Sequence, residues 1–280
     1  MAGAGRGRVV VTGASTGIGR ACAIRLARLG YTVLAGVRNP ADGEAIRTSC
    51  PGTIQPVLLD VTRPESIAAA LAAVGSGPLA GLVNNAGIAV TGPLELVALE
   101  AWRRQFEVNV IGLVAVTQAF LPSLRLAKGR VVNIGSIAGR SALPGSAPYD
   151  ASKFAIEAVS DSLRMEVSAF GVSVSLIEPG AVATPLWGKA LADVENIRRQ
   201  ATPERYEPYA RLLANLQQEA AESARKAISA DGVARAVERA MTARRPRTRY
   251  LVGPDAWFWL LLNLLPDRWR DRLILSRLQK

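Results

Sequence analysis

The sequence predicts a doubly wound α/β domain built on a parallel sheet. Two observations carry this prediction. Short β-rich runs alternate with helix-length stretches from the start of the chain, and most of these runs end in Gly, Asn, Asp or Ser, which are common where a strand turns into a helix. With 280 residues, 49% of them hydrophobic, the chain suits one large domain, or a domain with an appendage, rather than two separate cores.

Seven segments are expected to be strands. They are RVVVTG (8–13), TVLAGV (32–37), IQPVLLD (54–60), AGLVNNAG (80–87), GRVVNIGS (129–136), VSVSLIEPG (172–180) and RRPRTRYLVG (244–253). Helices are expected between them, because parallel neighbours need a crossover connection. Thr62 and Glu65, with Pro64 between them, form a capping-box pattern that predicts a helix start before SIAAALAAV.

Composition excludes several kinds of site and partner. The chain has no histidine, which removes histidine metal ligands and Ser-His-Asp machinery, so no metal site is expected. Of the net charge of +11, +6 lies in residues 240–280, which hold nine basic and three acidic residues; the rest is scattered, and no nucleic-acid partner is expected. Two cysteines and a start that runs directly into a strand pattern favour a cytoplasmic protein with reduced thiols.

The turn after the first strand, TGASTGIG, is a candidate phosphate-binding loop. The residues concerned are Gly13, Ser15, Thr16, Gly17, Ile18 and Gly19. In a parallel sheet, ligands bind where strands end. The glycines would let the backbone approach a phosphate, and the N–H groups of the following helix would face the anion. A tight connection without a ligand is the alternative interpretation.

The ends of the second and third strands bear on the choice of nucleotide. The second strand is followed by Arg38 and no carboxylate; an arginine suits a 2′-phosphate, so the sequence favours NADP(H) over NAD(H). The alternative is an ordinary solvated arginine. Asp60 and Val61 end the third strand, where they would contact the adenine. Capping of the next helix is the competing interpretation of Asp60.

Two amides and a glycine follow the apolar fourth strand, in NNAG. This strand is expected beside the first, so its end faces the same crevice as the glycine turn. Asn84 would tie neighbouring strands together, while Asn85, Ala86 and Gly87 would let a cofactor ribose lie against the main chain. A purely structural turn is the alternative.

Four residues form a candidate catalytic set. Ser136 ends the fifth strand, and Tyr149 and Lys153 follow at i and i+4 on one face of a predicted helix. An ammonium about 4 Å from the phenol contributes on the order of 4 kcal/mol at an effective dielectric near 20, which predicts a lowered tyrosine pKa. Ser136 would hydrogen-bond the substrate oxygen. Asn109 would bend its helix around a water that relays protons to Lys153, or is a satisfied buried amide.

Taken together, these motifs resemble the short-chain dehydrogenase/reductase family in order and spacing, over about residues 7–190. The resemblance implies a seven-stranded Rossmann sheet, a homodimer or homotetramer, and the catalytic set just named, with Tyr149 and Lys153 also contacting the cofactor. It further implies that four residues lie near the nicotinamide amide: Pro179, Gly180, Val182 and Thr184. The segment over 152–180 is similar to the branch that holds retinol, 17β-hydroxysteroid and 3-hydroxybutyrate dehydrogenases.

Residues 185–229 break the alternation and are interpreted as a substrate lid. An apolar wall, suited to a lipophilic alcohol or ketone, would come from Leu186, Trp187, Leu191, Tyr206, Tyr209, Leu212, Leu213 and Leu216. The alternative is that these residues only pack the lid onto the domain. An acidic substrate stays open because of Arg198, Arg199, Arg205 and Arg211.

The expected function is NADP(H)-preferring hydride transfer between nicotinamide and a lipophilic alcohol or carbonyl. The alternatives are a small-metabolite or acyl-thioester carbonyl reductase and a non-catalytic NADP-sensing protein. The catalytic domain is expected over 1–253. An amphipathic extension over 254–280 would either lie in a membrane interface, making the protein peripheral to the membrane, or close the substrate pocket or a subunit interface.

Overall fold

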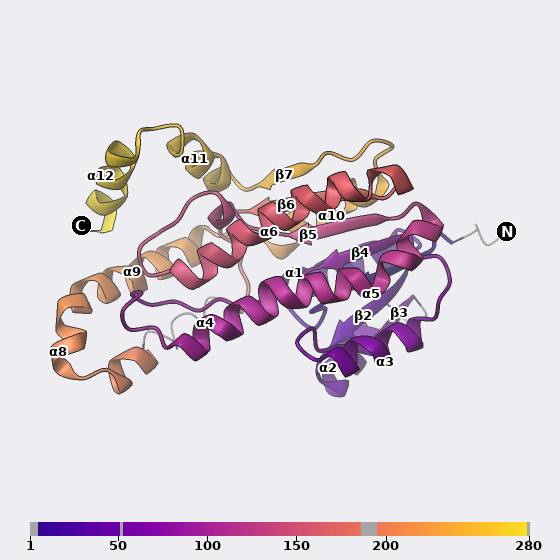
Figure 1. Ribbon diagram of the computed structural model, residues 1–280, viewed down its shortest axis with the longest axis horizontal. Coiled ribbons are helices and arrows are strands. Elements are labelled where there is room, and N and C mark those ends of the chain that lie inside the picture. The colour runs from indigo at the N-terminus through magenta and orange to yellow at the C-terminus, as the bar shows by residue number, and fades with distance from the viewer. Residues whose placement is uncertain (1–4, 51–52, 186–194, 279–280) are drawn as a thin grey trace.

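The computed structural model describes residues 5–50, 53–185 and 195–278 (Figure 1). Its centre is a seven-stranded sheet in the order β3-β2-β1-β4-β5-β6-β7, in which all neighbours are parallel. The strands are β1 (Arg8–Val11), β2 (Thr32–Val37), β3 (Ile54–Leu58), β4 (Gly81–Asn84), β5 (Arg130–Ile134), β6 (Ser173–Pro179) and β7 (Arg249–Val252). All seven were predicted, and β4 lies beside β1, as expected.

Helices cover both faces of this sheet. The α-helices are α1 (Gly17–Arg28), α2 (Pro40–Arg47), α3 (Pro64–Val74), α4 (Leu99–Phe106), α5 (Gly112–Ala127), α6 (Ala147–Glu166), α8 (Pro203–Tyr206), α9 (Ala210–Lys226), α10 (Ala230–Thr242), α11 (Pro254–Leu262) and α12 (Asp267–Leu278). Short turns of other helix types are η1 (Glu107–Ile111), η2 (Ile137–Gly139), η3 (Ser168–Phe170) and η4 (Glu207–Tyr209). The predicted doubly wound Rossmann sheet is therefore confirmed.

The side chains of β1 show how the two layers form. Val9 and Val11 pack in a core with α1 and α10, whereas Val10 packs in a second core with α3 and α5. All three are at most 2% exposed. Because successive side chains of a strand point to opposite faces, a continuous apolar run lets one strand contribute to both cores.

One helix start differs from the prediction. α3 begins at Pro64 with Arg63 as its N-cap, and no side chain caps it. Thr62 instead bonds back to Asp60: its hydroxyl and its backbone N–H donate to Asp60 Oδ1 at 2.8 and 3.0 Å. The capping-box prediction is wrong because the carboxylate two residues earlier takes the Thr62 hydroxyl as the chain leaves β3.

A long apolar helix runs through α4, η1 and α5, over Leu99–Ala127. It is the one helix in the described ranges whose length and hydropathy would suffice to span a membrane, and 44% of its apolar window is buried. Val116, Phe120 and Leu124 are fully buried and pack with β-strand and α3 side chains. These contacts are those of a core helix against the sheet.

The lid and the C-terminal extension meet at the carboxyl edge of the sheet. β7 leads through Gly253 into α11, and α12 packs against α9 of the lid. In Figure 1, α8 and α9 (orange) and α11 and α12 (yellow) lie at the same end of the molecule. Leu186, Trp187 and Leu191 lie outside the described residues. Ligands of such sheets bind at this edge, so both segments border the expected site.

The extension is helical, as predicted, but α11 is not amphipathic. Ala256 and Leu262 are buried, whereas Trp257, Phe258 and Leu261 are 57%, 40% and 62% exposed. Apolar side chains therefore surround this helix: its inner side packs on the domain, and no part of the chain that the structure describes covers its outer side.

Candidate active site

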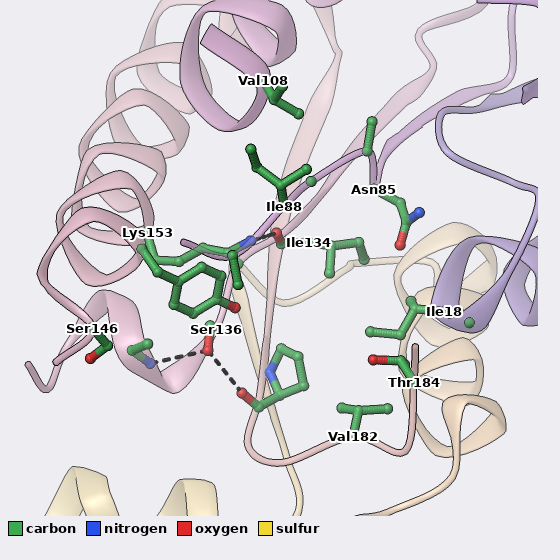
Figure 2. A pocket seen from close by; sticks show the side chains of 18 of the residues that line it. Ile18, Asn85, Ile88, Val108, Ile134, Ser136, Ser146, Lys153, Val182 and Thr184 are labelled. Atoms are coloured by element: carbon green, nitrogen blue, oxygen red, sulfur yellow. Dashed lines mark hydrogen bonds between the residues drawn. The ribbon is translucent and has the colours of Figure 1, made fainter. Parts of the chain in front are cut away.

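A cavity of about 920 Å³ lies at the carboxyl ends of the strands. It is lined by every predicted site residue except Gly19 and Asn109, which are buried. Figure 2 shows Ser136 and Lys153 on one side of the cavity and Ile18 and Thr184 on the other. The fold thus brings together residues from across the predicted segments, from the glycine turn to the end of β6.

The glycine turn has the shape that an anion site requires. Gly13 and Gly17 have φ values of +62° and +54°, which favour glycine. A Cβ on Gly19 would lie 2.2 Å from the Gly13 carbonyl oxygen and 2.4 Å from the Asn85 side-chain nitrogen, so no larger residue fits. α1 begins here without a side-chain cap, which leaves its first N–H groups available to a phosphate. These features fit a dinucleotide.

Thr12, which the sequence analysis missed, joins the glycine turn to NNAG. Its Oγ1 accepts hydrogen bonds from the backbone N–H groups of Asn85 and Ala86, both at 2.9 Å. The Asn85 side chain donates to the carbonyls of Thr12 and Gly13, both at 3.0 Å. The two turns are therefore fixed to one another, and a threonine at a strand end was the available signal.

Asn84 joins strands and helices inside the core, as predicted. Its Nδ2 donates to Thr117 Oγ1 and to Asn133 Oδ1, both at 2.9 Å. Asn133 in turn donates to Ser160 Oγ at 2.9 Å. All four side chains are buried, and this network links β4 to β5, α5 and α6. The Asn84 Nδ2 group is thus satisfied inside a dense core, whereas its buried Oδ1 has no hydrogen-bond partner.

Arg38 and Asp60 lie at the adenosine end of the cavity, where Arg38 is exposed and has no hydrogen bond or ion pair to a described residue. Burial acts to raise the pKa of Asp60, but the hydrogen bonds from Thr62 and the charge of Arg38 outweigh it, so the pKa is lowered. Asp60 therefore caps the turn and faces Arg38. A Cβ on Gly112 would lie 2.7 Å from Val61, so the start of α5 borders this end.

Ser136, Tyr149 and Lys153 meet where β5 ends. Ser136 is 7% exposed, and its hydroxyl donates weakly, at 3.5 Å, to the Pro179 carbonyl. Lys153 lies one helical turn after Tyr149 on α6, and its Nζ donates to the Ile134 carbonyl at 2.9 Å. The same Nζ lies 5.6 Å from the centroid of the Tyr149 ring. Figure 2 shows this lysine bond and the contacts of Ser136.

Burial is the largest effect on the pKa values of Tyr149 and Lys153. It raises the pKa of Tyr149 to about 12, an effect that the neighbouring Ser136 hydroxyl offsets only in part and the Asp150 carboxyl increases. Burial lowers the pKa of Lys153 to about 8. The predicted lowering of the tyrosine pKa is therefore wrong for the chain by itself, because both ionised forms lose their hydration. At neutral pH, Tyr149 carries its proton.

Asn109 sits in η1, a π-helical turn inside the long helix. Its Oδ1 accepts from the Ile88 N–H at 2.9 Å, and its Nδ2 donates to the Ile88 carbonyl at 3.0 Å and to Ser152 Oγ at 3.1 Å. It is 1% exposed. The amide is thus fully used, as the alternative interpretation held, and it ties the segment after NNAG to α6. The proton relay stays a prediction.

The segment after β6 closes on the glycine turn from the opposite side. A Cβ on Gly17 would lie 3.2 Å from Thr184 Cγ2. The Ala181 N–H donates to Asp255 Oδ2 at 2.5 Å, which anchors this segment to the start of α11. The cavity is lined by all four residues predicted here, Pro179, Gly180, Val182 and Thr184.

Apolar residues dominate the cavity beyond Tyr149. They are Leu143, Pro144, Gly145, Leu216, Ala220, Trp259 and Ile274. α9 packs closely here, since a Cβ on Gly145 would lie 2.2 Å from Leu216 Cδ1. Trp259 and Ile274 come from the C-terminal extension, so the extension closes the pocket, which was one of its open interpretations.

The lid contributes less of this wall than predicted. Among its described apolar residues, Leu216 lines the cavity, and the others do not: Tyr206, Tyr209, Leu212 and Leu213. Leu213 is 1% exposed and packs inside the molecule, whereas the Tyr209 hydroxyl donates to Glu95 Oε2 at 2.8 Å near the surface. The cavity lining also excludes Arg198, Arg199, Arg205 and Arg211.

A buried ionic cluster lies directly behind Pro179, and the sequence analysis missed it. Glu178 is fully buried and paired with Arg140, while Glu157 pairs with Arg249 at 3.0 Å. Burial raises the pKa of Glu157 to about 7; a hydrogen bond to Glu178 and its negative charge add to this effect, and Arg249 opposes it. The nearby carboxyl group of Glu178 therefore favours the protonated form of Glu157.

Folding stability is expected to fall as pH rises from about 4 to about 7, the range between the pKa values of Glu157 in the unfolded and folded chain. Glu157 binds its proton more tightly in the folded chain, with a pKa of about 7, than in the unfolded chain, where about 4.3 applies. Its contribution is therefore complete below about pH 4 and lost as pH rises through about 7. Glu157→Gln cannot ionise, so its melting temperature should gain about 5 °C on wild type between pH 5 and pH 8. A difference that is independent of pH would contradict the raised pKa of Glu157.

Known proteins that are similar in sequence to this chain are short-chain dehydrogenases and reductases. The family model described as short chain dehydrogenase matches residues 8–195. NADPH-dependent 3-dehydrocapnine reductase from Ornithobacterium rhinotracheale is 35% identical over 281 residues, which cover 97% of each chain. Retinol dehydrogenase 7 from Rattus norvegicus and 17-beta-hydroxysteroid dehydrogenase type 6 from Bos taurus are 40% and 38% identical, each over 276 residues that cover 95% of this chain and 87% of the relative.

Solved structures share the fold. A short chain dehydrogenase from Burkholderia cenocepacia in complex with NADP has a TM-score of 0.71 and 26% identity, and the match covers 99% of this chain and 98% of that one. A short chain dehydrogenase/reductase from Burkholderia phymatum in complex with NAD has a TM-score of 0.76 and 26% identity, over 91% and 92% of the two chains. The chain belongs to the short-chain dehydrogenase/reductase family and is an oxidoreductase of its retinol and hydroxysteroid dehydrogenase-like branch.

Proposed function

We propose that this enzyme prefers NADP(H) and transfers hydride between the nicotinamide and a lipophilic alcohol or its carbonyl partner. One observation carries the proposal: Ser136, Tyr149 and Lys153 border a predominantly apolar part of the same cavity that contains the glycine turn. Proton-transfer groups, a phosphate site and an apolar wall in one crevice are what hydride transfer to a lipophilic carbonyl requires.

The chain's own residues handle the proton and orient the substrate. Bound NADPH supplies the hydride that the carbonyl carbon accepts. Tyr149, protonated at neutral pH, donates its proton to the carbonyl oxygen as negative charge develops there. The Ser136 hydroxyl binds and orients the same oxygen. Lys153, with a pKa of about 8, exchanges protons near neutral pH and restores the tyrosine proton, with Asn109 as the proposed relay position.

The proposed cofactor contacts follow the cavity from end to end. The glycine turn would hold the pyrophosphate, Arg38 the 2′-phosphate, and Asp60 with Val61 the adenine. Asn85, Ala86 and Gly87 would hold the ribose, and the residues after β6 would hold the nicotinamide amide. The preference for NADP(H) is supported by Arg38 and by the name of the NADPH-dependent relative.

Substrate panels test this proposal. Purified protein is mixed with NADPH or NADH and with retinal, steroid ketones, long-chain aldehydes or acetoacetate, and cofactor oxidation is followed at 340 nm. We expect turnover of the apolar carbonyls, faster with NADPH. Turnover of acetoacetate alone would favour the small-metabolite reductase, and cofactor binding without any turnover would favour the sensing protein.

We further propose that the protein is cytoplasmic. We also propose that the outer face of its extension contacts a lipid bilayer, which would make the protein peripheral to the membrane. Trp257, Leu261 and Trp269 are 57%, 62% and 65% exposed. Arg268 and Arg272 flank Trp269 on α12 and supply positive charge. Exposed tryptophan and leucine beside arginine suit the interface of an anionic membrane. We also expect a homodimer or homotetramer, as the family resemblance implies.

Vesicle binding tests the membrane contact. Trp257→Glu combined with Trp269→Glu is expected to reduce co-sedimentation with vesicles containing anionic lipid at least about tenfold, because both changes place charge at the apolar interface. Leu126→Glu, at a position 68% exposed on α5, is the matched control and should bind like wild type. Equal binding by all three proteins would rule out this contact.

A further inference from the structure

One negative charge in the substrate half of the cavity has no role in holding the fold together. Among the described residues, five carboxylates line the cavity: Asp60, Glu107, Asp150, Glu219 and Asp255. Three of them accept hydrogen bonds from the chain: Asp60 from Thr62, Asp150 from Leu143 and Ser146, and Asp255 from Ala181. Glu107 belongs to η1, next to Val108, and is exposed.

Glu219 differs from the three aspartates because it has no partner among the described residues, and from the exposed Glu107 because it is partly buried and belongs to the lid. It lies on α9 between Leu216 and Ser223, and helical spacing puts these three residues and Ala220 on one face, which lines the cavity. Leu216 packs against Gly145, four residues before Tyr149, so this face borders the catalytic end. The carboxylate is partly buried, and no described residue gives it a hydrogen bond or an ion pair.

An unpaired carboxylate is costly beside an apolar ligand. When such a ligand displaces water from the cavity, the carboxylate loses hydration without a replacement partner. A ligand that carries an ammonium group supplies that partner, and a charge-assisted hydrogen bond is stronger than a neutral one. Three arginines also line the cavity, but all are exposed and none lies on the lid: Arg38 follows β2, and Arg103 and Arg104 lie on α4.

We propose that Glu219 binds a cationic amine of the substrate, and that the substrate class is therefore a long-chain ketone or alcohol with an amino group close to the reacting carbon. This inference rests on the proposed carbonyl reduction and narrows it. The apolar wall of Leu143, Trp259 and Ile274 would hold the chain while Glu219 holds the amine, so binding orients the carbonyl toward Tyr149.

A matched substrate pair tests the role of Glu219. A long-chain 2-amino-3-ketone and the 3-ketone of the same length without the amine are each reduced with NADPH, followed at 340 nm. Wild type should prefer the amino ketone. Glu219→Gln should lower the ratio of the two kcat/KM values about 10- to 100-fold, mainly through KM for the amino ketone, because a charge-assisted hydrogen bond is lost.

Glu222→Gln is the control, since Glu222 lies one turn further along α9 and does not line the cavity. It should leave the ratio unchanged. A Glu219→Gln variant that slows both ketones equally, or a wild type that favours the plain ketone, would overturn the amine assignment and leave the oxidoreductase proposal standing. If wild type reduces neither ketone nor any apolar carbonyl, the proposed function itself fails.

Discussion

Replacing Tyr149 with phenylalanine is expected to lower kcat for carbonyl reduction about 10²- to 10⁴-fold, the range that a positioned acid or base contributes. The phenol is held by burial in its protonated form, with a pKa of about 12, and it lies beside Ser136 in the wall of the pocket. Phenylalanine keeps the ring and its packing but has no proton to donate. The loss should therefore appear in kcat, while NADPH binding measured by fluorescence titration stays close to wild type.

Tyr209→Phe is the matched control for this change. The Tyr209 hydroxyl donates to Glu95 near the surface of the lid, and this residue does not line the cavity. Its removal should leave kcat within about twofold, since exposed hydrogen bonds contribute little. Full activity of Tyr149→Phe would mean that another group donates the proton. Equal losses in both variants would point to damage of the fold instead of the chemistry.

The second large effect is expected at Arg38. Arg38→Ala should lower kcat/KM for NADPH about 10²-fold and leave kcat/KM for NADH nearly unchanged, because the guanidinium would contact only the 2′-phosphate that NADH lacks. Within the described chain, Arg38 has no ion pair that would hold it elsewhere, and its charge already acts on Asp60 across the adenosine end. The measurement is initial rate against cofactor concentration at 340 nm, with one carbonyl substrate at saturation.

Arg47→Ala controls for a general loss of positive charge. Arg47 lies on α2 and pairs with Glu44 at the surface, away from the cavity. Its rates with both cofactors should match wild type. If Arg38→Ala lowers kcat/KM for NADH as much as for NADPH, Arg38 supports the loop after β2 and does not bind the 2′-phosphate.

Local sequence patterns were sufficient for the sheet and the cofactor end. The β-rich runs that end in turn residues gave all seven strands, and a continuous apolar run such as Val9 to Val11 is what a strand buried on both faces needs. The glycine turn after β1 was also predicted from its sequence. Only glycine fits at a position such as Gly19, because a Cβ there would clash with the Gly13 carbonyl. The residue type therefore reveals this backbone constraint directly.

The predictions failed where an interaction that the local pattern does not show competes with the expected one. Thr62 was expected to cap α3, yet its hydroxyl goes to Asp60. The tyrosine pKa was expected to fall because a lysine follows one turn later, but spacing along a helix says nothing about the burial that raises it. Glu157 lies on α6 and Glu178 on β6. No sequence pattern in either segment predicts that the two carboxyl groups lie close together.

By itself, the sequence determined the parallel α/β architecture, the glycine turn, the polar strand ends and the presence of Ser136, Tyr149 and Lys153, because each depends on residue type and short-range spacing. Only the tertiary structure decided which segments complete the pocket. Trp259 and Ile274 reach the cavity from the last helices, while most of the predicted lid wall does not. Which apolar side chains pack inward depends on contacts between segments far apart in the chain, and those contacts form only when the whole sheet is assembled.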